Sequence, residues 1–294
     1  MNTTPFANLY PTEPYKPVDE SLYDPAGTPP SGESLYNPAQ VGDRFSSVFV
    51  PPASPAPKGV FDAVTWIQNG TTPLRFLDGM TIRQSNVGLD SQIGVWGSDW
   101  CDDLDTESKV KNRPDAVLTD VAPITVYAYD ANQCGDLTQG SRDEVRARAQ
   151  QAMVLGEQTA VERSLAERFL AEAPNAGTAS TVIEAVSILE TALAKAGVSG
   201  CIHASPKWAA YLADGARLSN GGTSPMGHRW VFGGGYADTL GDTLVATTDL
   251  FGWRGPLAVR DTIQYDQNRY VVVVERSLLI AYEAAVAAVT VTPA

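Results

Sequence analysis

The chain has 294 residues, of which 44% are hydrophobic, so it can bury one large core or two ordinary ones. Its formal net charge of −13 argues against a surface that neutralises nucleic-acid phosphates or anionic lipid. The cysteines, Cys101, Cys134 and Cys201, form no CxxC pair, and the opening residues lack the basic start and apolar stretch of a signal peptide. We expect free thiols in a reducing compartment, without a disulfide framework or a zinc site.

Residues 1–57 contain 12 of the 20 prolines, and this predicts an extended arm without a core of its own. The arm contains a repeat, because "LYP" begins at position 9, "LYDP" at 22 and "LYNP" at 35, with 13 residues between starts. One interpretation is chance similarity in a low-complexity tail. The other is a contact motif whose Leu-Tyr pairs each occupy a pocket. Its candidate contact residues are Leu9, Tyr10, Leu22, Tyr23, Leu35 and Tyr36.

Residues 60–130 alternate short apolar groups with Gly, Asn and Asp, which predicts short strands and loops. The polar segment "DDLDTESKVKNRPDAV", from 102 to 117, is predicted to be an exposed hairpin tip. The segment "PITVYAY", from 123 to 129, is predicted to be a strand with alternating faces.

A long helix is predicted over 142–173. Ser141 and Glu144 form a capping-box pattern at its start, and Pro174 ends it. Val161, Leu165 and Phe169 recur every four residues and predict a buried stripe. Such a helix spans roughly 45 Å. The alternative is two shorter helices broken near Gly156, because glycine weakens a helix interior.

A second helix is predicted between the capping box of Thr181 and Glu184 and the stop signal of Gly197. The segment "GCIHA", from 200 to 204, then predicts a short strand, and Ser205 with Pro206 predicts the start of a third helix.

The most apolar run closes the chain, from 269 to 294. A membrane anchor is not expected, because Glu275, Arg276 and Glu283 interrupt the run. Its β-branched residues favour two core strands or one long bent strand. Because helices and strands mix without regular βαβ alternation, the predicted class is α+β.

The search for chemistry points to no catalytic, cofactor or metal site. Cys201 and His203 lie two residues apart on a predicted strand, so both side chains face one side. They could form a nucleophile and base, but two core residues is the interpretation we favour. The "GGGY" segment at 233 lacks the register of a phosphate or dinucleotide loop and predicts a turn or a bulge.

The order of these elements resembles the major capsid protein of tailed bacteriophages, which has the Hong Kong 97-type fold. The segments "GCIHASPKWAAYLADG" and "VERSLLIAYEAAVAAVTV" carry the resemblance most clearly, and their style is similar to actinobacterial phage capsid proteins. The resemblance covers essentially the whole chain and rests on order and texture, because none of these segments is a catalytic signature.

The resemblance implies four parts. Residues 1–60 would be an N-terminal arm, and 61–128 a linker with an extended loop. Residues 129–180 and 259–282 would form a peripheral domain with the long spine helix, and 181–258 and 283–294 an axial domain.

The resemblance also implies a function. The chain would not be an enzyme; it would self-assemble through pentamers and hexamers into an icosahedral virion shell enclosing double-stranded DNA, built in the bacterial cytoplasm. Portal, scaffolding and decoration proteins would be partners, without membrane contact, and scaffolding would come from another protein because no charged helical segment precedes the arm. Some family members crosslink a loop lysine to an asparagine; Lys109, Lys111 and Asn268 are available here, but no motif pairs them.

Two alternatives stay open. The first is an encapsulin-like shell that stores a cargo enzyme, against which the long arm counts. The second is a small enzyme that uses Cys201 and His203.

Overall fold

The computed structural model describes residues 51–56, 58–67, 79–88, 93, 115, 117–133, 137–213 and 222–292. The chain divides into two units, Met1–Pro51 and Pro52–Ala294, and every helix and strand below belongs to the second. The mixture of long helices with one largely antiparallel and one mixed sheet is of the α+β class, as the sequence predicts.

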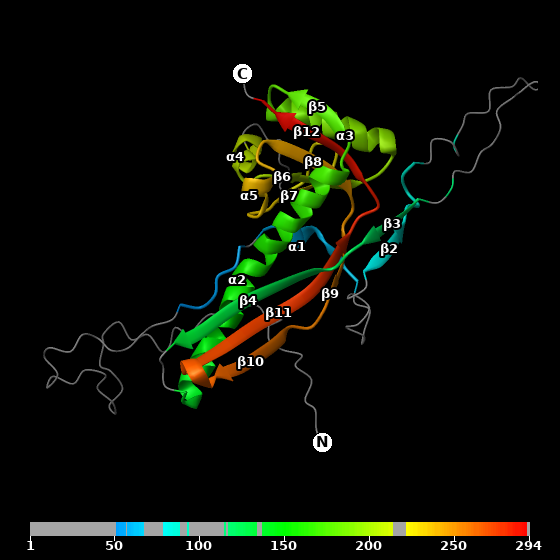
Figure 1. The fold of residues 1–294 in the computed structure, drawn as a ribbon. Helices are drawn as coiled ribbons and strands as arrows, with labels where there is room; N and C mark the ends of the chain where they lie inside the picture. The colour runs from blue at the N-terminus through cyan, green and yellow to red at the C-terminus, as the bar shows by residue number, and fades with distance from the viewer. Residues whose placement is uncertain are drawn as a thin grey trace, which may run out of the picture. The chain divides into compact units, whose positions relative to one another are not determined.

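The elements follow each other along the chain as Figure 1 shows. The helices are α1 (Val60–Ala63), α2 (Gln139–Glu172), α3 (Val182–Ala196), α4 (Lys207–Ala213), α5 (Tyr236–Thr239) and the 3-10 turn Tyr265–Gln267. The strands are β1 (Thr65–Trp66), β2 (Met80–Arg83), β3 (Leu118–Val121), β4 (Ile124–Gln133), β5 (Asn175–Ala179), β6 (Gly200–Ala204), β7 (Arg229–Phe232), β8 (Thr243–Thr248), β9 (Phe251–Arg254), β10 (Ala258–Gln264), β11 (Arg269–Ala281) and β12 (Ala285–Val291).

Helix α2 is one continuous helix of 34 residues, about 51 Å long. This confirms the prediction of one long helix over the alternative of two helices broken near Gly156, and a Cβ added at that glycine would meet no atom within 4 Å. The helix ends at Glu172, just before Pro174 as predicted. Its predicted start was wrong by one turn, because the N-cap is Thr138, whose hydroxyl accepts the amide of Ser141.

Three strands form what we call the ribbon, namely β4, β10 and β11. Strand β11 is 13 residues long and pairs antiparallel with β10 from Arg269 to Glu275 and with β4 from Arg269 to Leu278. The last four residues of β11 pair antiparallel with β9. Strand β9 also pairs in parallel with the two-residue strand β1. Along most of β11 every second side chain is buried, which matches a sheet that packs on one face.

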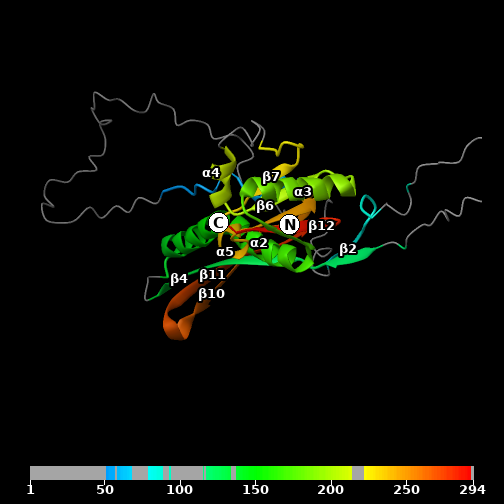
Figure 2. The same ribbon diagram turned by 90° about the horizontal axis from the view of Figure 1, so that it is seen from above.

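A second sheet has the strand order β5-β12-β8-β6-β7. One face packs against α3 and α4 in a core that includes Leu189, Ile202 and Leu244. The other face packs against the second half of α2, as the contact between the rings of Phe169 and His203 shows. We call this three-layer arrangement the sandwich; Figure 2 shows α3 and α2 on opposite sides of its strands.

The apolar run at the end of the chain forms β11 and β12, which confirms two strands. Strand β11 belongs to the ribbon and β12 to the second sheet, so the run connects the two large sheets. No helix among the described residues has the length and apolar character that a membrane span requires.

The helix signals of α3 are also confirmed. The Thr181 hydroxyl accepts the Glu184 amide at 3.2 Å, and Gly197 is left-handed with φ 70°. The Glu184 carboxylate reaches the amide and hydroxyl of Ser180 instead of the amide of the N-cap residue itself. These bonds lower the pKa of Glu184 below its ordinary value.

Candidate assembly surfaces and their anchors

The residues that the sequence singled out as arm contacts, Leu9, Tyr10, Leu22, Tyr23, Leu35 and Tyr36, lie outside the described residues. The same holds for Cys101, Cys134, Lys109 and Lys111. Asn268 is described, and it occupies a left-handed position with φ 46° in the turn between β10 and β11.

The candidate pair of Cys201 and His203 lies on β6 inside the sandwich. Both ring nitrogens of His203 have partners, the Tyr236 hydroxyl at 3.1 Å and the Thr247 hydroxyl at 3.0 Å. Burial lowers the pKa of His203 to about 3 and raises the pKa of Cys201 to about 12. A histidine held neutral by two hydrogen bonds beside a protonated thiol does not make a nucleophile and base. The structure therefore favours the core interpretation of this pair.

The described residues hold no cluster of three or more His, Cys, Asp or Glu that could bind a metal ion. The segment around 233 forms a turn before α5, as predicted, and its glycines have a packing role.

That role centres on Glu162, a carboxylate of α2 that is 0% exposed. Its oxygens accept the amide of Val60 at 2.9 Å and the amide of Gly235 at 2.8 Å. Glu162 thus holds α1 and the start of α5 against the long helix. Burial raises the pKa of this carboxyl, and the two amide bonds oppose the shift.

Three glycines make room for this carboxylate. A Cβ at Gly59 would lie 2.4 Å from a Glu162 oxygen, and one at Gly233 would lie 2.5 Å from its carboxyl carbon. A Cβ at Gly235 would lie 2.6 Å from the Glu162 Cβ. The "GGGY" segment is therefore glycine-rich because α5 and the turn before it approach α2 closely. Sequence reasoning missed Glu162, since it looks like any helical glutamate.

A buried ion-pair group connects α2 to the strands near the middle of the helix. Glu157 is 3% exposed and accepts bonds from Arg254 of β9 at 2.6 Å and from Arg276 of β11 at 3.1 Å. Two guanidinium groups donate to one buried carboxylate, so the charge of Glu157 is compensated inside the protein.

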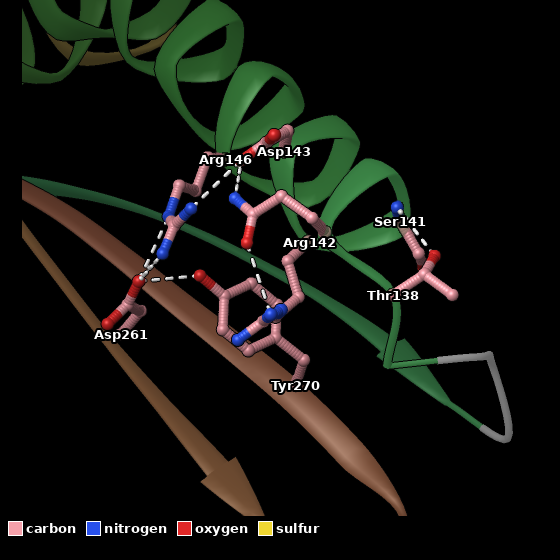
Figure 3. A network of polar contacts seen from close by, with 8 residues as sticks. Thr138, Ser141, Arg142, Asp143, Arg146, Asp261 and Tyr270 are labelled. Atoms are coloured by element: carbon pink, nitrogen blue, oxygen red, sulfur yellow. Dashed lines mark hydrogen bonds and ion pairs between the residues drawn. The ribbon is translucent and has the colours of Figure 1, made fainter.

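A polar network joins the first turns of α2 to the far end of the ribbon (Figure 3). The Arg146 Nε and the Tyr270 hydroxyl both donate to Asp261 of β10, at 2.9 and 2.5 Å. These bonds lower the pKa of Asp261, while burial and the carboxylate raise the pKa of Tyr270 to about 12. On the helix side, the Arg146 guanidinium also donates to Asp143. The Gln139 side-chain amide donates to the same Asp143 oxygen. The network fixes the end of the ribbon on the helix.

The strands β2 and β3 form a two-stranded stem, with Met80 opposite Val121 and Arg83 opposite Leu118. Residues 84–117 connect the two strands, so the predicted exposed hairpin tip lies between them and mostly outside the described residues. Glu283 holds the residues that follow β2, because its carboxylate accepts hydrogen bonds from the backbone amides of Ser85 and Asn86 at 3.2 and 2.9 Å.

The outer face of the ribbon, which points away from α2, exposes aromatic residues. Tyr127 and Tyr129 of β4 are 71% and 48% exposed. They stand opposite Glu275 and Val273 of β11, whose neighbours along the strand, Val272 and Val274, are buried. This face is the first candidate surface for assembly.

The second candidate surface is a groove of about 750 Å³ beside the start of α3 and α4. Val182, Ile183, Trp208, Tyr211 and Val291 supply its apolar lining. The side chains of Ile183 and Tyr211 are 44% and 63% exposed, which is uncommon for residues of this size that lie together.

Comparison with known proteins finds no matching family model and no matching curated protein. The structure is similar to a chain of Mycobacterium phage Bobi, with a TM-score of 0.48 and 14% sequence identity over 89% of this chain and 96% of that one. It is similar to a chain from the bacteriophage PhiM1 mature capsid, with a TM-score of 0.45 and 11% identity over 84% and 90% of the two chains. It is also similar to a chain of a virus-like particle from Pyrococcus furiosus, with a TM-score of 0.42 and 13% sequence identity over 61% of this chain and 79% of that one.

Proposed function

We propose that this protein is the major capsid protein of a tailed bacteriophage and self-assembles into an icosahedral shell that encloses double-stranded DNA. In that shell the copies form pentamers and hexamers, and portal, scaffolding and decoration proteins are further partners. The shell assembles in the bacterial cytoplasm and becomes part of the virion.

The observation that carries the proposal is the order of parts along the chain. A stem for an extended loop (β2–β3) precedes one long helix, and the ribbon packs along that helix. Four of the five strands of the second sheet, β5 to β8, lie between α2 and β9 along the chain, and β12 completes that sheet after β11. This is the order that the resemblance in the sequence implies for a capsid subunit. A rod about 51 Å long is unusual in a small domain with one core, and it suits a subunit that spans a shell.

The pairing of strands refines the proposed domains. Strand β5, within the proposed peripheral segment 129–180, pairs with β12, and β9, within the proposed axial segment 181–258, pairs with β11. We therefore assign β5 to the axial part, which contains the second sheet, and β9 to the peripheral part, which contains the ribbon. The arm stays at 1–60 and the linker with the extended loop at 61–128.

The charge and the exposed side chains support a role in self-assembly. A net charge of −13 keeps an inner wall from binding DNA phosphates. Tyr127, Tyr129, Tyr211 and Ile183 offer apolar area to neighbouring copies. The Leu-Tyr pairs of the arm would add contacts, since each buried leucine contributes about 2 kcal/mol and the copies multiply the effect.

The test is electron microscopy of the purified full-length chain, together with its sedimentation coefficient. We expect hollow particles of megadalton mass. A monomer or a small oligomer at every concentration and salt tested would contradict the proposal. A variant in which Tyr10, Tyr23 and Tyr36 are all alanine should still fold, and its particles should dissociate at a lower temperature.

A further inference from the structure

The groove beside α3 combines exposed apolar side chains with a largely buried aromatic ring. Tyr211 lies against Trp208, with ring centroids 5.6 Å apart and planes at 52°. Trp208 is 6% exposed, and its ring forms part of the groove. Ile183, in the first turn of α3, contributes to the same lining. The result is an aromatic surface open to solvent on one side.

Charged side chains border the groove. The ion pair of Lys207 and Asp242 lies at the rim, and the Lys207 ammonium stands 5.0 Å from the indole ring.

An aromatic groove has the chemistry that binds proline-rich extended segments. Their prolines stack on aromatic rings, and little conformational entropy is lost on binding because such segments are already extended.

The chain itself carries segments of this kind. Its first 57 residues contain 12 prolines, and three of their segments read "LYP", "LYDP" and "LYNP". Residues 1–50 lie outside the described part and join it at Pro51. Fifty extended residues reach up to roughly 165 Å, which is enough to pass from one copy to another. We propose that the groove binds one of these Leu-Tyr segments from the arm of another copy of this chain.

This inference rests on the proposed function, because a shell is what brings the arm of one copy to the groove of another. It adds the position of the contact and the role of each residue. The leucine and tyrosine fill the space beside Ile183 and Tyr211, and the proline packs on the Trp208 ring.

The direct test is binding of a labelled peptide with the sequence of residues 18–28, "VDESLYDPAGT". The receptor is the full-length chain with Tyr10, Tyr23 and Tyr36 changed to alanine, so that its own arms compete less. We expect saturable binding, measured by fluorescence polarisation. A peptide with alanine at Leu22 and Tyr23 should bind at least about tenfold more weakly.

Groove variants in the same background locate the site. Tyr211→Ser should weaken peptide binding about tenfold, and Ile183→Ser, which removes the other exposed apolar side chain, about fivefold. The matched control is Tyr265→Ser, because Tyr265 is 82% exposed and belongs to the turn between β10 and β11. The control should bind as the parent does. Equal binding by all three variants, or by the alanine peptide, would overturn the inference.

Microscopy separates this result from the proposed function. Particles that form without any peptide binding would overturn the groove contact and leave the shell. Groove-dependent peptide binding by a chain that never forms particles would support the contact and remove the shell.

Discussion

The ribbon and the sandwich use β-structure in two different ways. The second sheet has helices on both faces, and all five residues of β6 are buried. The ribbon has α2 on one face only, and its other face exposes Tyr127 and Tyr129. The sandwich therefore completes its own core, whereas the ribbon depends on polar anchors to α2 and leaves apolar area for a partner.

The anchors differ in the same way. Near the sandwich, Glu162 is fully buried and satisfied by two backbone amides. At the end of the ribbon, Arg146 and Asp261 are about one-third exposed. A buried acceptor is worth more than an exposed ion pair, because water competes only with the latter. The predictions below follow that order.

The largest effect is expected from Leu165→Asp, which places a carboxylate in the core that α2 shares with the strands. Leu165 is 1% exposed, so the cost should exceed about 4 kcal/mol and prevent soluble expression. The control is Leu170→Asp on the same helix, where the side chain is 42% exposed and the change should be tolerated. Soluble, correctly folded Leu165→Asp protein in circular dichroism would show that this stripe does not face a core.

The second effect concerns Glu162→Ala, which leaves the amides of Val60 and Gly235 without their acceptor. We expect a loss of about 3 kcal/mol in the free energy of unfolding, measured by urea titration. Glu184→Ala is the comparison, since it removes a surface acceptor of the Ser180 amide and should cost less. An equal loss in both variants would contradict the special position of Glu162.

The pH dependence of the same carboxyl can be measured separately. Burial raises the pKa of Glu162 in the folded state, so the folded protein binds its proton more tightly than the unfolded chain. Its contribution to stability is therefore greatest at low pH and falls as pH rises from the ordinary value of 4.5 through the raised pKa. Glu162→Gln should lack this component. Parallel pH profiles for the two proteins would contradict the assignment.

A smaller effect is expected from Asp261→Asn at the end of the ribbon. The change removes the charge that Arg146 and Tyr270 share, at a cost of at most about 1 kcal/mol because the site is partly exposed. Since the pKa of Asp261 is lowered, its contribution is present above the unfolded pKa and is lost as pH falls through the folded one. A loss as large as that of Glu162→Ala would remove the distinction between the two anchors.

The smallest effect on the subunit is expected from Tyr127→Ser on the outer face of the ribbon. Tyr127 is 71% exposed, so the free energy of unfolding should change by less than about 0.5 kcal/mol. Val272→Ser on the covered face, where the side chain is 0% exposed, is the matched comparison and should cost several times more. Similar losses would show that both faces belong to the subunit's core.

Local patterns in the sequence determined much of the fold. Val161, Leu165 and Phe169 predict the buried stripe of α2, and all three are at most 1% exposed. Thr181 and Gly197 predict both ends of α3, and the β-branched run of β11 predicts a strand. These features depend on neighbours within one or two turns, which a sequence pattern contains.

Only the tertiary structure decided the anchors and the groove. Glu162 meets Val60 across 102 positions, and Glu283 meets Asn86 across 197. The sequence analysis placed the start of α2 at Ser141, but in the folded chain Thr138 is the N-cap and the Ser141 hydroxyl accepts a bond from Asn132 of β4. A glutamate, a tryptophan and a tyrosine carry no sign of their distant partners, because burial and hydrogen bonding arise only when the chain has folded and brought those segments together.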